Sequence, residues 1–325
     1  MRFARRFHGH LRSAVSNVAK NAIRALGILL AAISISWIVY RFVRTGVIEQ
    51  LLNSSHVSGL LCSVCVAIPI YAVGLCCAGL AWFCLQTAFL PKRPPLVALF
   101  ATYATTQFAK YLPGNVGHYV GRHLILRRLG MSHRAILLAS LGEAGFLVLA
   151  SLVWTSSALT ILWPKLGLSA SAWQVLVLEC AGLGVSYAGL QWWRSRHALV
   201  EEWVPLHSPS WLLLVLPLEL LLFAAMALAL MSPTYDLLSN PASLWLIPAA
   251  AAGSWVAGFL VVGAPAGIGV RELVFLALLR GHMQEADILL LAAAFRIITF
   301  GGDIVILLLG LVLGAARVDA GSADR

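Results

Sequence analysis

Long runs of apolar residues, separated by short polar segments, dominate the pattern along this chain. Several runs of Leu, Ala, Val and Ile reach about 20 residues, the length of α-helix that crosses the hydrocarbon core of a bilayer. A membrane β-barrel would show short segments of alternating polarity instead. The pattern therefore predicts an all-α fold, a polytopic transmembrane helical bundle.

The apolar segments set the expected organisation of the bundle. We expect Pro69 to kink the second of them. We also expect one integral membrane domain over residues 1–325, with no separate soluble domain. The predicted apolar segments are residues 22–40, 57–90, 96–110, 135–163, 172–192, 211–231, 242–262, 270–280 and 286–315.

Composition and charge support a membrane location. Only 11% of the residues are charged, whereas a soluble domain has roughly a quarter. The net charge of +10 comes from Lys and Arg that cluster between apolar runs, as they do in cytoplasmic loops. We therefore predict a multi-pass protein of the cell (inner) membrane, with a cytoplasmic N-terminus and cytoplasmic loops at 91–95 and 194–197, and no nucleic-acid partner.

Metal and redox chemistry find little support in the sequence. Cys62 and Cys65 have the spacing of a metal or redox pair, but the second pair that a zinc site needs is missing. The histidines and nearby acids match no zinc motif. We predict no metal and no cofactor, and we interpret all six cysteines as packing residues. The residues weighed and set aside are Cys62, Cys65, Cys76, Cys77, Cys84, Cys180, His118, His123, His282, Glu285 and Asp287.

Two short segments rich in Pro and Gly interrupt the apolar pattern. The first, residues 113–117, reads PGNVG, and the second, residues 265–269, reads PAGIG. An alignment of the two without a gap places Arg128 on Arg280. We predict two broken helices, which can be re-entrant, within an internal repeat, because paired interruptions are typical of a transporter's binding site. The repeat halves would cover about residues 57–163 and 211–315, in parallel or inverted orientation.

Each interruption is followed by an arginine, Arg122 after the first and Arg271 after the second. Pro favours the first turn of a helix, so each interruption would start a new helix. Free N–H groups at such a start bind anions, and a guanidinium donates paired bonds to phosphate. The alternative is a packing kink with an interfacial Arg. The predicted substrate-binding residues are Pro113, Gly114, Asn115, Gly117, Arg122, Pro265, Gly267, Gly269, Arg271 and Glu272.

Several ionisable residues fall inside the predicted spans. Each costs a few kcal/mol at the bilayer centre unless it is paired or wet, so we expect them to face the bundle interior. We predict a polar network of Glu143, Arg296 and Asp303, in which Arg296 pairs with Glu143 or with Glu272. Structural ion pairs that fix helix packing are the alternative. Glu179 and Glu219 stand alone in the sequence and are weaker candidates.

Two motifs resemble signatures of the lysylphosphatidylglycerol synthase/flippase membrane-domain family. The second is the more specific, since its usual form is Pro-Gly-Gly-Leu-Gly-x-Arg-Glu. The matching residues are 110–117 with Arg122 and 130–132, then 263–272, and finally Arg296 and Asp303. Ala266 departs from the usual Gly, His118 stands where many members have Glu, and Arg122 comes one residue later. These departures leave the substrate open.

The resemblance implies a stand-alone member that handles lipid and lacks the soluble aminoacyltransferase domain. We expect a lipid flippase, or a transporter of a lipid-linked substrate with an anionic phosphate headgroup, and not an enzyme. The alternative is a non-catalytic membrane scaffold for a separate lipid-modifying or glycosyl-transferring enzyme. A membrane-embedded transferase acting through Glu143, Glu272 or Asp303 is a weaker third hypothesis, because no nucleophile or nucleotide-binding motif is present.

Overall fold

A computed structural model describes most of the bundle. It covers residues 57–90, 95–111, 116–156, 206–235, 246–261 and 265–323, with isolated positions at 36, 40, 177, 181, 184 and 188. Within these residues the chain forms eight α-helices and no β-strand, which confirms the all-α prediction. The predicted spans at 22–40 and 172–192 fall almost wholly outside the described residues.

The helices follow the apolar segments closely. They are α3 (Val57–Phe89), α4 (Leu96–Gln107), α5 (Gly117–Arg128), α6 (His133–Ser156), α10 (Leu212–Tyr235), α11 (Leu246–Leu260), α12 (Val270–Leu279) and α13 (Glu285–Ala323). Short 3-10 turns η1 (Phe108–Tyr111), η3 (Pro209–Trp211) and η5 (Pro265–Gly267) flank them. Helix α3 continues through Pro69.

Four of the helices are long and apolar enough to cross a membrane, and they make this a multi-pass membrane protein. These spans cover Gly59–Phe89, His133–Ser156, Pro209–Met231 and Glu285–Gly314. Helix α11 has 15 residues, fewer than the about 20 of a straight crossing. Most of its residues are buried, so it lies among other helices and not against lipid.

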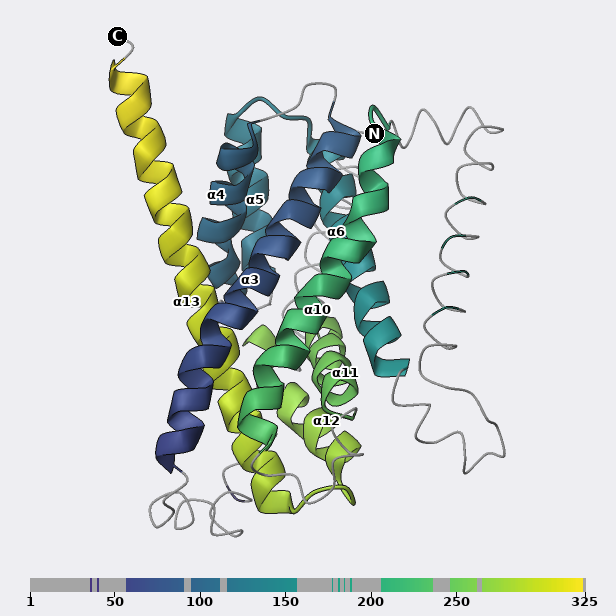
Figure 1. Ribbon diagram of the computed structural model, residues 1–325. Helices are drawn as coiled ribbons and strands as arrows, with labels where there is room; N and C mark the ends of the chain where they lie inside the picture. Colours follow the sequence, from purple (N-terminus) through teal and green to yellow (C-terminus); the bar gives the residue numbers. More distant parts are fainter. Residues whose placement is uncertain are drawn as a thin grey trace, which may run out of the picture.

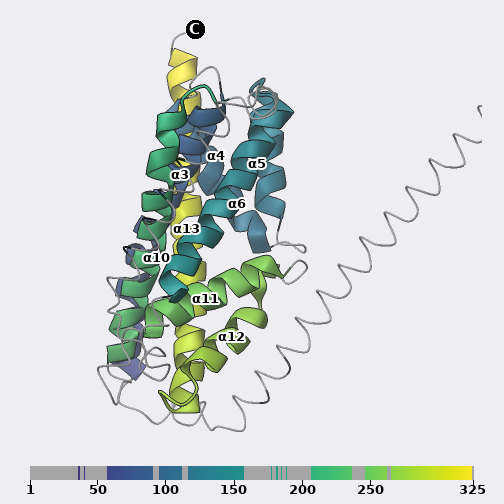
Figure 2. The ribbon, with the colours of Figure 1, turned by 90° about the vertical axis from the view of Figure 1, so that its right-hand side faces the viewer.

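The long helices frame two pairs of short ones. Helix α3 packs along α10, and α13 packs against α3 and α4 over much of the bundle's height. Helices α4 and α5 occupy the upper half of the molecule in Figure 1, and α11 and α12 occupy the lower half. Figure 2 gives the same division from the side. The two short pairs meet near mid-height, where η1 contacts η5.

Glycines of the long helices allow neighbouring helices to approach closely. A Cβ added to Gly74 of α3 would lie 2.8 Å from Ala225 Cβ of α10. One added to Gly310 of α13 would lie 2.7 Å from Ala104 Cβ of α4. Lipid supplies no hydrophobic driving force between helices, so such close contacts hold the bundle together.

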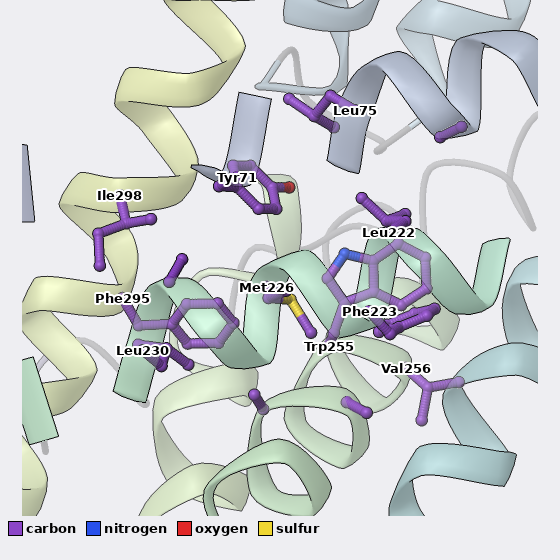
Figure 3. Close-up of a cluster of buried hydrophobic side chains, with 14 of the residues drawn as sticks. Tyr71, Leu75, Leu222, Phe223, Met226, Leu230, Trp255, Val256, Phe295 and Ile298 are labelled. Carbon is purple, nitrogen blue, oxygen red and sulfur yellow. The ribbon is translucent and has the colours of Figure 1, made fainter. Parts of the chain in front are cut away.

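The apolar core lies where four helices meet. Figure 3 shows Tyr71 and Leu75 of α3 facing the Phe223 and Trp255 rings of α10 and α11. The Phe223 and Trp255 rings meet edge to face, with centroids 5.2 Å apart. Phe295 and Ile298 of α13 close the cluster on the other side. Trp255 of this core also lies against Arg271 at the start of α12.

Candidate functional site

The second predicted interruption is a true break in the helical backbone. Between α11 and α12, φ is +49° at Ala266, +67° at Gly267 and +87° at Gly269. Ala266 is the only residue other than Gly with a positive φ among the described residues. An L residue pays about 1–2 kcal/mol for the left-handed conformation, so surrounding contacts must hold it there.

Arg296 of α13 supplies those contacts. Its two terminal nitrogens donate to the carbonyl oxygens of Ala266 and Gly267, each at 3.0 Å. Its Nε forms an ion pair with Glu272, whose other oxygen accepts from the Gly269 N–H at 2.7 Å. The predicted pairing of Arg296 with Glu272 is confirmed, and the alternative with Glu143 is wrong. Arg296 thus satisfies backbone groups that the break exposes, as the membrane interior requires.

Arg271, the second residue of α12, occupies a slot made by two glycines. Its side chain contacts Gly258 of α11, where a Cβ would collide with Arg271 Cγ, and a Cβ on Gly267 would lie 2.9 Å from Arg271 Nε. Its guanidinium carbon lies 5.6 Å from the centre of the Trp255 ring. The residue is 7% exposed. Its Nε has no hydrogen-bond partner, and no carboxylate within the described residues forms an ion pair with it.

The first interruption is described only at its edges. Pro113, Gly114 and Asn115 lie outside the described residues. Gly117, at the start of α5, lies against the carbonyl oxygen of Ala109, and no larger residue would fit there without a shift. Because η1 contacts η5, the edge of the first interruption and the second interruption are neighbours. This contact agrees with the prediction that the two interruptions lie near each other. The prediction is not tested for residues 112–115, which lie outside the described residues.

Asp303 of α13 joins the first interruption to the last span. Lys110 Nζ donates to one carboxylate oxygen of Asp303 at 2.8 Å, and Tyr111 Oη donates to the other at 2.7 Å. Asp303 is fully buried. Sequence reasoning named Asp303 as part of a polar network but omitted Lys110 and Tyr111 from the candidate site. A lysine at the end of an apolar segment, next to a Pro/Gly interruption, was the signal that could have found this pair.

Five charged side chains gather around the two interruptions, and we call them the central cluster: Lys110, Arg271, Glu272, Arg296 and Asp303. Arg271 lies within electrostatic range of Glu272 and both other cations. The cluster holds three cations and two carboxylates, so one positive charge is in excess. Lys110 pairs with Asp303 and Arg296 pairs with Glu272, which leaves Arg271 as the excess cation.

Arg122 has a different environment from Arg271. One of its terminal nitrogens donates to both carboxylate oxygens of Glu143, at 2.6 and 2.7 Å, and the other donates to Gln107 Oε1 at 2.7 Å. Its guanidinium carbon lies 4.2 Å from the centre of the Tyr103 ring. This geometry is that of the structural ion pair. The predicted role of Arg122 in phosphate binding stays a prediction, since a phosphate would have to displace Glu143.

The remaining candidates divide by burial. Glu219 of α10 is fully buried, and neither carboxylate oxygen has a hydrogen-bond partner within the described residues. Cys62 and Cys65 are free and exposed on α3, so their interpretation as packing residues is wrong for these two. Their exposed positions lie on a membrane-spanning helix, facing outward from the bundle.

Two further candidates, Glu179 and Cys180, lie outside the described residues. In the part of the chain that the structure describes, no three His, Cys, Asp or Glu side chains gather as a metal site.

Comparison with known proteins does not add to this geometry. No protein-family model matches the chain. No curated protein matches it either. The candidate site therefore depends on the contacts described above.

Proposed function

We propose that this protein is a lipid flippase, or a transporter of a lipid-linked substrate, that binds a phosphate headgroup at the central cluster. The observation that carries the proposal is Arg271, a buried cation without a paired carboxylate in the described residues. An unpaired charge at membrane depth is costly and marks a functional site. A phosphodiester carries one negative charge, which matches the one excess positive charge of the cluster.

The backbone around Arg271 favours the same ligand. Left-handed residues next to right-handed ones form concavities that bind anions, and the positive φ values between Ala266 and Gly269 are of this kind. Arg271 follows directly at the start of α12, where the helix dipole also attracts anions. The guanidinium would therefore bind the phosphate beside the helix start, where Glu272 already accepts from the Gly269 N–H, while the lipid chains remain in the bilayer.

The arrangement of the short helices supports transport. The pair α4 and α5 and the pair α11 and α12 occupy opposite halves of the bundle and meet at mid-height (Figures 1 and 2). In many transporters two such elements flank a midplane site, and movement of one against the other gives alternating access. We infer an inverted internal repeat with halves near residues 57–163 and 211–315, in a cell membrane protein whose N-terminus is cytoplasmic.

The motif resemblance to the lysylphosphatidylglycerol synthase/flippase membrane domain supports the same class of substrate. It covers the residues that form the second interruption and the start of α12. On this proposal membrane lipids are the partners, and the protein performs no chemical reaction on them.

Arg271→Lys tests the proposal. The purified protein is reconstituted into phosphatidylethanolamine/phosphatidylglycerol vesicles with a chain-labelled fluorescent phosphatidylglycerol, and dithionite quenching reports movement between leaflets. Lys keeps the charge but loses the planar fork. Loss of a charge-assisted hydrogen bond costs about 1.5–3 kcal/mol, so transport should fall about 10- to 150-fold. Thermal stability in detergent should change little.

Arg280→Lys is the matched control. Arg280 follows α12 and is exposed, so the same substitution there should leave transport unchanged. Normal transport by Arg271→Lys would exclude Arg271 as the phosphate ligand.

A membrane scaffold is the second candidate, and a specific observation favours it. Lys110, Arg122 and Arg296 are each paired with a carboxylate, as in a bundle whose polar groups serve packing. If the wild-type protein moves labelled phosphatidylglycerol no faster than empty vesicles, the scaffold becomes the better hypothesis. Co-purification of a lipid-modifying or glycosyl-transferring enzyme would then support it.

A further inference from the structure

Glu219 is a buried acid that the proposed phosphate site does not use. It lies in the first half of α10, and its side chain is fully buried. Both carboxylate oxygens lack a hydrogen-bond partner within the described residues. Every other fully buried carboxylate of the described spans, Glu143 and Asp303, has a cationic partner. Among the fully buried carboxylates of the described spans, Glu219 is therefore the one without a cationic partner.

The groups that face Glu219 do not neutralise it. Those within electrostatic range are Cys77 of α3, Tyr103 of α4, Tyr119 and Arg122 of α5 and Glu143 of α6. Among these five, only Arg122 is a cation, and Glu143 already pairs with it.

The other elements packed against α10 supply no counter-ion. Helix α11 and turn η3 carry no ionisable side chain. In the spanning part of α13, Glu285–Gly314, the only cation is Arg296, and it is paired with Glu272 in the central cluster. The region around Glu219 thus has one carboxylate in excess whenever Glu219 is ionised, the opposite of the excess at the central cluster.

An ionised carboxylate in such a place has to acquire a cation. Transfer of an unpaired carboxylate into an apolar medium costs far more than protonating it. A metal ion would need several oxygen ligands, and no group of three or more His, Cys, Asp or Glu side chains suited to a metal is found among the described residues. A proton is the cation that a single carboxyl group can hold alone.

We propose that Glu219 is a proton-binding site, and that its protonation and deprotonation accompany movement of the phosphate-bearing lipid through the central cluster. The coupling rests on the proposed function, whereas the proton site does not. In the described conformation Glu219 is closed off from water and holds its proton. A conformation that opens this side of the bundle would wet the carboxyl group and let the proton leave. One proton then compensates the charge of one phosphodiester, so that transport of the pair carries no net charge.

Infrared difference spectroscopy tests the proton site without any substrate. The wild-type protein, in phosphatidylethanolamine/phosphatidylglycerol vesicles, should show the carbonyl stretch of a protonated carboxyl group, and this band should fall as the pH is raised. Glu219→Gln should lose the band while keeping its thermal stability. Glu219→Asp should keep the band at a shifted frequency, which assigns it even if Glu219→Gln does not fold. Absence of the band in the wild-type protein, or its survival unchanged in these variants, would overturn the proton site.

Transport under a pH gradient tests the coupling. A gradient across the vesicles should drive net movement of labelled phosphatidylglycerol by the wild-type protein at least several-fold faster than at equal pH. Glu219→Gln should lose this acceleration, and Arg280→Lys should retain it. Equal acceleration in wild type and Glu219→Gln would refute coupling at Glu219. If the wild-type protein moves no lipid at all, the proposed function and the coupling both fail, while the infrared band still decides whether Glu219 binds a proton.

Discussion

At the scale of single residues, the bundle contains two kinds of buried charge. Arg122 and Glu143 satisfy each other, with Gln107 as a further partner. Arg271 and Glu219 are also buried but form no ion pair within the described residues. Pairs of the first kind hold helices in register, whereas we propose that groups of the second kind bind a ligand, a phosphate at Arg271 and a proton at Glu219.

This distinction predicts opposite effects of one substitution at two positions. Glu143→Gln removes the partner of a buried Arg122, and breaking a buried pair in this way costs about 3–5 kcal/mol. Glu219→Gln replaces a neutral, protonated carboxyl group with a neutral amide of the same shape, so stability should change by less than about 1 kcal/mol. Thermal unfolding of both variants in one detergent measures the difference. Equal destabilisation by the two substitutions would mean that Glu219 has an ionic partner.

At the scale of elements, the α11–η5–α12 segment positions the site. The two helices cannot continue into each other, because three backbone positions between them have positive φ. Arg296 satisfies the carbonyl groups of the break from α13, and Gly258 leaves room for Arg271 beneath it. The element thus holds the Arg271 guanidinium at mid-bundle without an ion pair to any carboxylate of the described residues.

Gly258→Ala should displace Arg271 without removing it. The new Cβ would collide with Arg271 Cγ, so the side chain has to leave its slot. We expect transport of labelled phosphatidylglycerol to fall at least about 10-fold, equivalent to 1.4 kcal/mol. The measurement is the dithionite assay described above.

Gly145→Ala is the control for this substitution. Gly145 also lies within a helix, α6, and a Cβ there meets no atom within 4 Å. Alanine is the better helix former by about 1 kcal/mol, so this variant should be slightly more stable and transport normally. Loss of transport in Gly145→Ala as well would show that the assay responds to any change of helix packing.

At the scale of the whole molecule, basic residues gather at one end of the bundle. The turn between α5 and α6 lies at the upper end in Figures 1 and 2, together with the start of α4, and it is flanked by Arg127, Arg128 and Arg134. The turn between α12 and α13 lies at the opposite end. The positive-inside rule therefore predicts that the upper end is cytoplasmic.

Cysteine labelling in intact cells checks this orientation. In a background without native cysteines, Ser132→Cys should resist a membrane-impermeant thiol reagent, and His282→Cys should react. Both positions are exposed in the structure, so burial does not explain a difference. A third cysteine at Ser195, in the loop expected to be cytoplasmic, should behave like position 132. Strong labelling of position 132 or 195 from outside the cell would contradict the predicted orientation.

The sequence by itself determined the helical membrane fold and predicted that its ionisable residues lie inside the bundle. Apolar length predicts spans because each backbone group in lipid needs an internal partner, which a helix provides locally. The same reasoning located the break at 265–269 and the buried acids and arginines, since Pro, Gly and charge act on their immediate surroundings. The internal repeat and the first break remain predictions, because residues 112–115 lie outside the described residues.

Only the tertiary structure decided which charges are satisfied. Lys110 and Asp303 form an ion pair although they are 193 positions apart in the sequence. Arg296 pairs with Glu272 and not with Glu143, because α13 packs beside α12. The sequence treated Arg122 and Arg271 as equivalent, since each follows a Pro/Gly interruption. In the packed bundle, Arg122 pairs with a carboxylate of α6, whereas Arg271 contacts two glycines and a Trp ring. Ion pairing depends on distances between segments far apart in the chain, and no local pattern records those distances.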